Sequence, residues 1–243
     1  MLLYYITDRH QFGGSELEKT QKLLARIAEA ARCGVDFIQL RERDLSAREV
    51  ERLAREAQAA IRNSQANLPD RQDVPYKRSK GIFPRLLINS RLDVALAVGA
   101  DGVHLRANDM NAGEARAVAA KVRQRRTPTR IREFVISAAC HTQAEVRLAE
   151  AHGANLVLFG PVFEKIDNSF SAVGIQALRK ACHDRHAANP PAPIVALGGV
   201  TVKNAKLCLN AGAAGLAGIR LFQDGNLSET VSKLRALEES ASK

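Results

Sequence analysis

Charged residues follow directly on a short apolar run near residue 40, in the segment Ile38-Gln39-Leu40-Arg41-Glu42-Arg43-Asp44. A buried parallel strand has this pattern when its carboxyl end opens into a site. Charged groups are costly to bury unless they are paired or engaged by a ligand. The two arginines of the segment, Arg41 and Arg43, therefore predict that an anion is held at the end of this strand.

Glycines near the end of the chain form a second pattern that favours an anion. Gly198-Gly199 and Gly218 each follow an apolar run. Glycine lets a ligand come close to the backbone amides, here those of the glycines and of Ile219. Arg220 comes next, and a guanidinium pairs with phosphate through two parallel hydrogen bonds. We expect a phosphate site here; the alternative is that these glycines only make tight turns.

The elements that must position these residues alternate between apolar runs and segments of helical spacing. The expected strands are Leu2–Thr7, Phe37–Arg41, Leu86–Asn89, Gly102–Leu105, Phe134–Ala138, Leu156–Phe159, Ile194–Leu197 and Gly215–Ile219. The expected helices are Glu16–Cys33, Ala47–Asn63, Leu92–Val98, Ala112–Arg125, Gln143–His152, Ile175–Ala187, Ala205–Ala211 and Leu227–Glu239. Because parallel strands need a crossover connection, the alternation predicts parallel pairing.

Eight strand–helix units in 243 residues predict an α/β protein of one domain, a (β/α)8 barrel. The alternative, a doubly wound open sheet, usually has a glycine-rich turn after its first strand, where this chain has Asp8-Arg9-His10. Active sites of such barrels lie at the carboxyl ends of the strands, which is where both anion-binding patterns fall. Residues 64–80 are polar, include two prolines and interrupt the alternation, so we expect a loop insertion there.

The composition narrows the class of partner. A net charge of +10 favours phosphorylated small molecules. Nucleic-acid binding is the weaker alternative, because the basic residues are spread over helices and only three tyrosines and no tryptophan are available for base stacking. The sequence predicts no membrane span. A strand that begins at residue 2 leaves no room for a signal peptide, and four scattered cysteines favour a reduced, cytoplasmic protein.

Six motifs stand in order at the expected strand ends. They are Tyr5-Ile6-Thr7-Asp8-Arg9, Ile38–Glu42, Leu87–Ala95, Gly99–Leu105, Phe159–Phe163 and Ala196–Val200. With these motifs the chain resembles the thiamine phosphate synthase/TenI family of (β/α)8 barrels, over nearly its whole length. The resemblance implies a thiazole phosphate ligand and one of two activities. A synthase joins hydroxymethylpyrimidine diphosphate to thiazole phosphate with magnesium and releases diphosphate, whereas a TenI-type tautomerase aromatises a carboxythiazole phosphate by moving a proton.

The resemblance also assigns roles to positions of this chain. Gln39, Arg41 and Asn89 match residues that hold the pyrimidine and the diphosphate in the synthases, and Asp109 matches one magnesium-binding aspartate. Other positions depart from the synthases. They are Arg43 in place of a lysine, Ser90 in place of the second metal aspartate, Arg106-Ala107 in place of Gly-Gln, Ala139 in place of a serine, and 164–168, which lacks two threonines and a lysine.

These departures favour the tautomerase, because magnesium normally keeps one or two carboxylates beside substrate phosphates. We therefore expect an isomerase that needs no cofactor. In this hypothesis Arg41 pairs with the substrate carboxylate and Asn89 orients it, while Gln39 and Arg43 contribute to binding. The amides of the glycine pattern hold the phosphate. The alternatives are a synthase with magnesium at Asp109 and a non-catalytic binder of thiazole or thiamine phosphates. Dimers are common among such barrels, so a homodimer is one option.

Two histidines are candidates for chemistry. His141 follows the fifth expected strand and matches the histidine given the proton-transfer role in the tautomerases. An unperturbed pKa of about 6.5 suits histidine to such a role. The alternative is a strand-end histidine that caps the helix beginning near Thr142, and a histidine also occurs here in synthases. His104 lies within the fourth strand, so we expect it to be packed inside the barrel.

Overall fold

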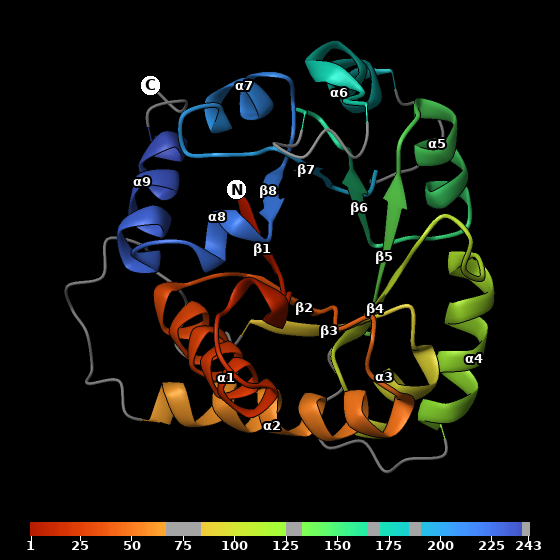
Figure 1. The fold of residues 1–243 in the computed structure, drawn as a ribbon. Coiled ribbons are helices and arrows are strands. Elements are labelled where there is room, and N and C mark those ends of the chain that lie inside the picture. Colours follow the sequence, from red (N-terminus) through yellow and green to blue (C-terminus); the bar gives the residue numbers. More distant parts are fainter. Residues whose placement is uncertain (67–83, 125–132, 165–170, 185–190, 240–243) are drawn as a thin grey trace.

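Eight parallel strands close into a barrel in the order of the sequence (Figure 1). The computed structural model describes residues 1–66, 84–124, 133–164, 171–184 and 191–239. The strands are β1 (Leu2–Ile6), β2 (Phe37–Leu40), β3 (Arg85–Asn89), β4 (Gly102–Leu105), β5 (Val135–Cys140), β6 (Leu156–Phe159), β7 (Ile194–Leu197) and β8 (Gly215–Gly218). Pairing of β8 with β1 closes the sheet. The predicted (β/α)8 barrel is confirmed.

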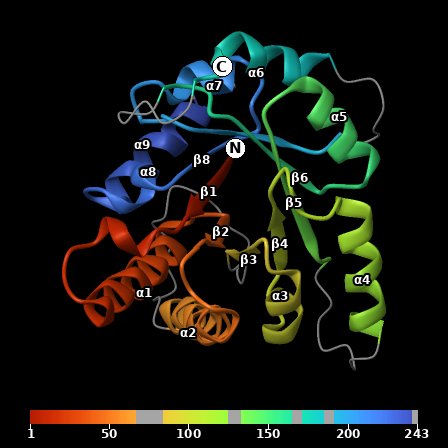
Figure 2. The same cartoon turned by 45° about the vertical axis from the view of Figure 1, so that its right-hand side comes forward.

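Helices surround the strands on the outside (Figures 1 and 2). They are α1 (Glu16–Cys33), α2 (Ala47–Ala66), α3 (Leu92–Val98), α4 (Ala112–Gln124), α5 (Gln143–Ala151), α6 (Gly174–His183), α7 (Ala205–Asn210) and α9 (Leu227–Glu239). Two short elements were not predicted: the 3-10 helix η1 (Arg9–Gln11) after β1, and α8 (Arg220–Gln223) after β8. Both are too short to leave a helical period in the sequence. Among the described residues, no helix is long and apolar enough to cross a membrane.

Some boundaries differ from the prediction. Helix α2 continues to Ala66, so the loop expected at 64–80 begins inside a helix, where Ser64 is buried and its hydroxyl donates to the carbonyl oxygen of Ile61 at 2.8 Å. The rest of that segment lies outside the described residues. Strand β5 runs on to Cys140. Helix α6 ends at His183, and the last residues predicted for it also lie outside the described part.

Alternation along the strands divides the apolar side chains into two layers. Tyr4 and Ile6 of β1 belong to a cluster inside the barrel, together with side chains such as Leu87 and Leu158. The other side of the strands packs against the helices in a second, larger cluster. The interior of the barrel is therefore filled with side chains.

Close contact between neighbouring strands fixes a glycine in β4. A Cβ atom at Gly102 would lie 2.1 Å from the carbonyl oxygen of Val135 in β5. We expect Gly102→Ala to lower the free energy of unfolding by about 2–4 kcal/mol, because backbone on both sides would have to shift. The matched control is Gly13→Ala, whose Cβ would meet nothing within 4 Å. Urea unfolding of both variants tests this, and equal stability of the two would contradict it.

Candidate active site

Polar side chains line the barrel beneath the carboxyl ends of β1, β2 and β3. Gln39 is buried; its Oε1 accepts from the Tyr4 hydroxyl at 3.1 Å and its Nε2 donates to Asn89 Oδ1 at 2.9 Å. The Nδ2 of Asn89 donates to the Ser90 hydroxyl at 3.2 Å. These contacts fix the orientation of both amides. Each amide nitrogen has two N–H groups, so one on Gln39 and one on Asn89 remain for a ligand.

His104 lies at the same level of the barrel, on β4. As expected it is buried, and its Nδ1 lies 3.0 Å from the Ser137 hydroxyl. Burial lowers the pKa of His104 to about 4, with Asp109 opposing the shift and the positive charge of Arg41 adding to it. At neutral pH His104 is therefore an uncharged hydrogen-bonding group.

A buried ion pair joins the ends of β1 and β2. The guanidinium of Arg9 lies 3.2 Å from the carboxylate of Glu42, and the two side chains are only 5% and 1% exposed. The Glu42 carboxylate also accepts from the Thr7 hydroxyl at 2.6 Å and from the Arg9 backbone amide at 3.0 Å. The same guanidinium contacts Asp44, at 2.7 Å, and Glu16 of α1, at 3.0 Å.

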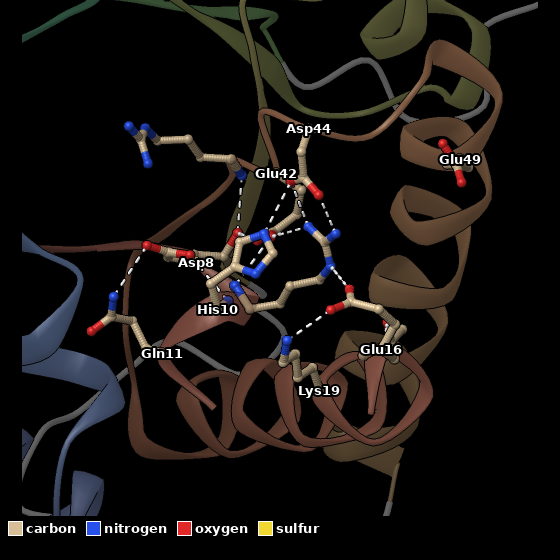
Figure 3. Close-up of polar contacts among 12 residues, drawn as sticks. Asp8, His10, Gln11, Glu16, Lys19, Glu42, Asp44 and Glu49 are labelled. Carbon is tan, nitrogen blue, oxygen red and sulfur yellow. Dashed lines mark hydrogen bonds and ion pairs between the residues drawn. The ribbon is translucent and has the colours of Figure 1, made fainter. Parts of the chain in front are cut away.

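Carboxylates therefore converge on one cation at this edge of the barrel. Figure 3 shows Asp44, Glu42 and Glu16 pointing into the same space, with His10 beside them and Lys19 on the far side of Glu16. Burial raises the pKa of Glu42 despite its hydrogen bonds, whereas the Arg9 guanidinium lowers the pKa of Asp44. The two carboxylates of the segment 41–44, those of Glu42 and Asp44, are thus paired with Arg9 within the protein.

Arg41 and Arg43 are left without such partners. The backbone amide of Arg41 donates to the Thr7 hydroxyl at 2.9 Å, but its guanidinium makes no hydrogen bond or ion pair with a described residue. The same holds for the exposed guanidinium of Arg43. Arg41 is half-buried, and its pKa is lowered by burial first and then by the neighbouring charge of Arg43. These two cations lie just beyond the end of β2, where the sequence predicts an anion site, and the binding of an anion there stays a prediction.

Asp109 follows β4 in a turn that is closed by a hydrogen bond of 3.0 Å from the Asp109 backbone amide to the Arg106 carbonyl oxygen. Its carboxylate accepts from the Arg106 amide at 2.8 Å and from the Arg106 guanidinium at 3.2 Å. Burial raises the pKa of Asp109, but the hydrogen bonds from Arg106 and from the Ser90 hydroxyl outweigh burial and lower it. Ser90 itself has a positive φ of 59° and donates its amide to the His104 carbonyl oxygen at 2.8 Å.

These residues do not form a ready magnesium site. Asp109 brings one carboxylate, which is already engaged by Arg106 and Ser90. Within the described parts of the chain, no group of three or more His, Cys, Asp or Glu side chains is placed to hold a metal ion. Magnesium at Asp109 therefore stays a prediction from the resemblance.

The loop after β6 packs tightly on the end of β7. Gly198 and Gly199 have φ values of 93° and 62°, and a Cβ atom on them would lie 2.5 Å from Pro161 and 2.7 Å from Phe163, respectively. The turn therefore requires glycine at both positions. A phosphate remains compatible with this turn, because no described residue accepts a hydrogen bond from the amides of Gly199 and Ile219.

The end of β8 is tied back to β1. Asp8 and Gln223 of α8 exchange two hydrogen bonds, from the Asp8 amide at 2.8 Å and to the Asp8 carbonyl oxygen at 2.9 Å. The Arg220 side chain is exposed, with its Nε 3.5 Å from Gln11 Oε1. The phosphate-binding role of Arg220, Gly198 and Gly218 stays a prediction. Sequence reasoning missed Gln223, because nothing in its neighbourhood marks a partner 215 residues away.

His141 lies apart from the arginines, after β5. It is exposed, its Nδ1 lies within hydrogen-bonding distance of the Gly160 carbonyl oxygen, and its backbone amide donates to Glu145. Thr142 is the residue that caps α5, in a capping box with Glu145. The contacts of His141 therefore join the end of β5 to the start of the loop after β6.

Comparison with known proteins identifies the family. The family model described as "Thiamine monophosphate synthase" matches residues 3–74 and 84–222. The chain belongs to this family. It is 37% identical over 238 residues to a putative thiamine-phosphate synthase of Geobacter sulfurreducens, covering 97% of this chain and 93% of that one. It is 33% identical over 236 residues to the thiamine-phosphate synthase of Methanoculleus marisnigri, covering 96% and 93%.

A solved structure agrees with the sequence comparison. The thiamine phosphate pyrophosphorylase of Pyrococcus furiosus superposes with a TM-score of 0.72 at 25% identity, covering 98% of this chain and 96% of that one. Members of the thiamine monophosphate synthase family that resemble this chain over nearly its full length thus carry the name of a transferase.

The expectation of an isomerase is therefore wrong. It rested on missing metal ligands, above all Ser90 in place of an aspartate, and on the altered loop at 164–168, most of which lies outside the described residues. Losing a carboxylate weakens a metal site but leaves the positive charges of Arg41 and Arg43 in place. The proton-transfer role of His141 was assigned only as a step of the tautomerisation, so it is withdrawn together with the isomerase.

Removing the buried cation should destabilise the barrel strongly. We expect Arg9→Met to lower the free energy of unfolding by about 3–5 kcal/mol, because it leaves the buried Glu42 carboxylate without its counter-charge. The control is Arg55→Met, which breaks the exposed pair with Glu51 at 2.8 Å and should cost less than about 1 kcal/mol. Urea unfolding at pH 7 measures both. A loss in Arg9→Met no larger than in the control would show that Arg9 is not needed.

His104 should make the protein less stable in weak acid. Its folded pKa of about 4 lies below the unfolded value of 6.5, so below pH 6.5 the unfolded chain binds a proton that the folded one does not. Stability from this group is complete above pH 6.5 and falls toward pH 4. Between pH 7 and pH 4.5 we expect the free energy of unfolding of His104→Gln to fall by about 2 kcal/mol less than that of the wild type. Parallel pH dependences would refute this.

Proposed function

We propose that this chain is a thiamine phosphate synthase, which joins hydroxymethylpyrimidine diphosphate to thiazole phosphate and releases diphosphate. The observation that carries the proposal is the pair of uncommitted guanidinium groups, Arg41 and Arg43, above the fixed amides of Gln39 and Asn89. The names of the relatives support it. A diphosphate leaving group carries several negative charges, and fixed cations aimed at developing charge are an effective means of catalysis.

Each of the two substrates would bind to its own group of residues, at a different part of the barrel mouth. The remaining N–H groups of Gln39 and Asn89 suit the ring nitrogens and substituents of the pyrimidine, while Arg41 and Arg43 hold its diphosphate. The free amides of Gly199 and Ile219 suit the thiazole phosphate, with Gly198, Gly218 and Arg220 around them. Strand β7 neighbours β8, and β8 neighbours β1, whose other neighbour is β2, so the two substrates would meet across the mouth.

The decisive assay incubates the purified protein with both substrates and magnesium and measures thiamine phosphate. We expect Arg41→Gln to lower kcat/KM by about 10²–10³-fold, because a charge that stabilises the leaving group is lost from a half-buried position. The control is Arg147→Gln on the exposed face of α5, where the side chain, among the described residues, donates only to the Asp184 carbonyl oxygen at 3.3 Å. Its activity should match that of the wild type.

Each outcome of the assay has a clear meaning. Absence of product from folded wild-type protein would overturn the synthase proposal. Thermal stabilisation by thiazole phosphate without turnover would then identify a non-catalytic binder. Full activity of Arg41→Gln would leave the synthase standing but remove Arg41 from its machinery.

A further inference from the structure

We propose that Arg106 is a diphosphate-binding residue, whose guanidinium moves from Asp109 to the ligand and supplies positive charge where a metal ion would otherwise be required. The inference rests on the proposed function and adds a residue and a charge source to it. The starting observation is that Arg106 directly follows β4, and that β4 neighbours β3, which neighbours β2.

The sheet register brings the three arginines to one sector of the mouth. Asn89 pairs with His104, and Leu40 pairs with Ile88, so the residues just beyond these positions rise from adjacent strand ends. Arg41 and Arg43 follow β2, and Arg106 follows β4. The Arg106 side chain is 51% exposed, so its guanidinium has room to move.

The electrostatic interactions among the three arginines agree with this placement. Burial is the main cause that lowers the pKa of Arg41, and the positive charges of Arg43 and Arg106 add to it against the opposing charges of Asp8 and Glu42. Burial also lowers the pKa of His104, and Arg106 acts on it in the same direction. Cations held close together disfavour one another's charged forms, and an anion with several charges relieves that repulsion. Diphosphate has this charge and enough oxygens to meet more than one guanidinium.

The contact of Arg106 with Asp109 is suited to exchange. The guanidinium makes one hydrogen bond of 3.2 Å to Asp109, and because the Arg106 side chain is 51% exposed and that of Asp109 13%, water reaches this contact from the arginine side. Asp109 keeps its bonds from the Arg106 amide, at 2.8 Å, and from Ser90 when that contact is given up. The carboxylate is therefore held in place while the guanidinium turns to the ligand.

This arrangement accounts for the poor fit of a metal ion. The oxygens of Asp109 are engaged by donors of the protein, and Ser90 brings no second carboxylate. A guanidinium in the same place carries a fixed positive charge that does not depend on metal supply.

The test is calorimetric titration of inorganic diphosphate into the full chain, in EDTA and at one fixed salt concentration, since exposed charge interactions are screened by salt. We expect the wild type to bind and Arg106→Gln to bind at least about tenfold more weakly, because a charge-assisted hydrogen bond is lost. The matched control is Arg55→Gln, in which an exposed arginine of helix α2, paired with Glu51 at 2.8 Å, is replaced. Its affinity should stay within about twofold of the wild type.

A second variant tests the exchange itself. Asp109→Asn removes the carboxylate that competes for Arg106, so we expect diphosphate to bind more tightly in EDTA. Unchanged affinity in Arg106→Gln, or binding that appears only with added magnesium, would overturn the inference. Diphosphate binding that depends on Arg106 in a protein that makes no thiamine phosphate would uphold this site and refute the synthase. Thiamine phosphate synthesis with diphosphate binding that does not depend on Arg106 would uphold the synthase and refute this site.

Discussion

The mouth of the barrel depends on the buried ion pair between Arg9 and Glu42. Glu42 is almost completely removed from solvent. Its carboxylate accepts hydrogen bonds from the Thr7 hydroxyl and the Arg9 backbone amide, and it pairs with the Arg9 guanidinium. Buried ion pairs contribute little net stability compared with apolar packing, but losing one partner is costly. The geometric effect of this pair is therefore its main one: the first residues beyond β1 and β2 are locked to each other.

Locking these residues separates the charges of the segment 41–44. Glu42 and Asp44 turn toward Arg9, while Arg41 and Arg43, at the alternate positions, remain without a partner among the described residues. Thr7 links the two sets, since its hydroxyl donates to Glu42 and accepts from the Arg41 amide. A sequence of alternating charges thus becomes a neutralised outer edge and a positively charged mouth. The amides of Gln39 and Asn89 lie beneath the positive side.

The fold was predictable from the sequence because its signals are local. Short apolar runs and helical spacing each occupy one segment, and their alternation leaves few topologies. The charged strand ends were also visible, so Arg41, Arg43 and Asp109 were placed correctly at the carboxyl ends of strands. Partners were not predictable: Arg9 with Glu42 and Asp8 with Gln223 are chosen by tertiary packing. The activity was misjudged because the missing ligand at Ser90 and the altered loop at 164–168 were counted against the transfer reaction, although the arginines of the segment 41–44 were visible in the sequence.

The backbone at Ser90 determines which side chains this position accepts. With a φ of 59°, this position has the left-handed conformation that aspartate and asparagine enter more readily than most residues. An aspartate at this position would therefore need no change of the backbone, and its carboxylate would lie directly beside Asp109. A chain with an aspartate here and no arginine in the following turn would differ from this one at positions 90 and 106 and could share everything beneath them. Dependence on a metal would then be a trait that a lineage can lose or regain in two substitutions on an unchanged barrel.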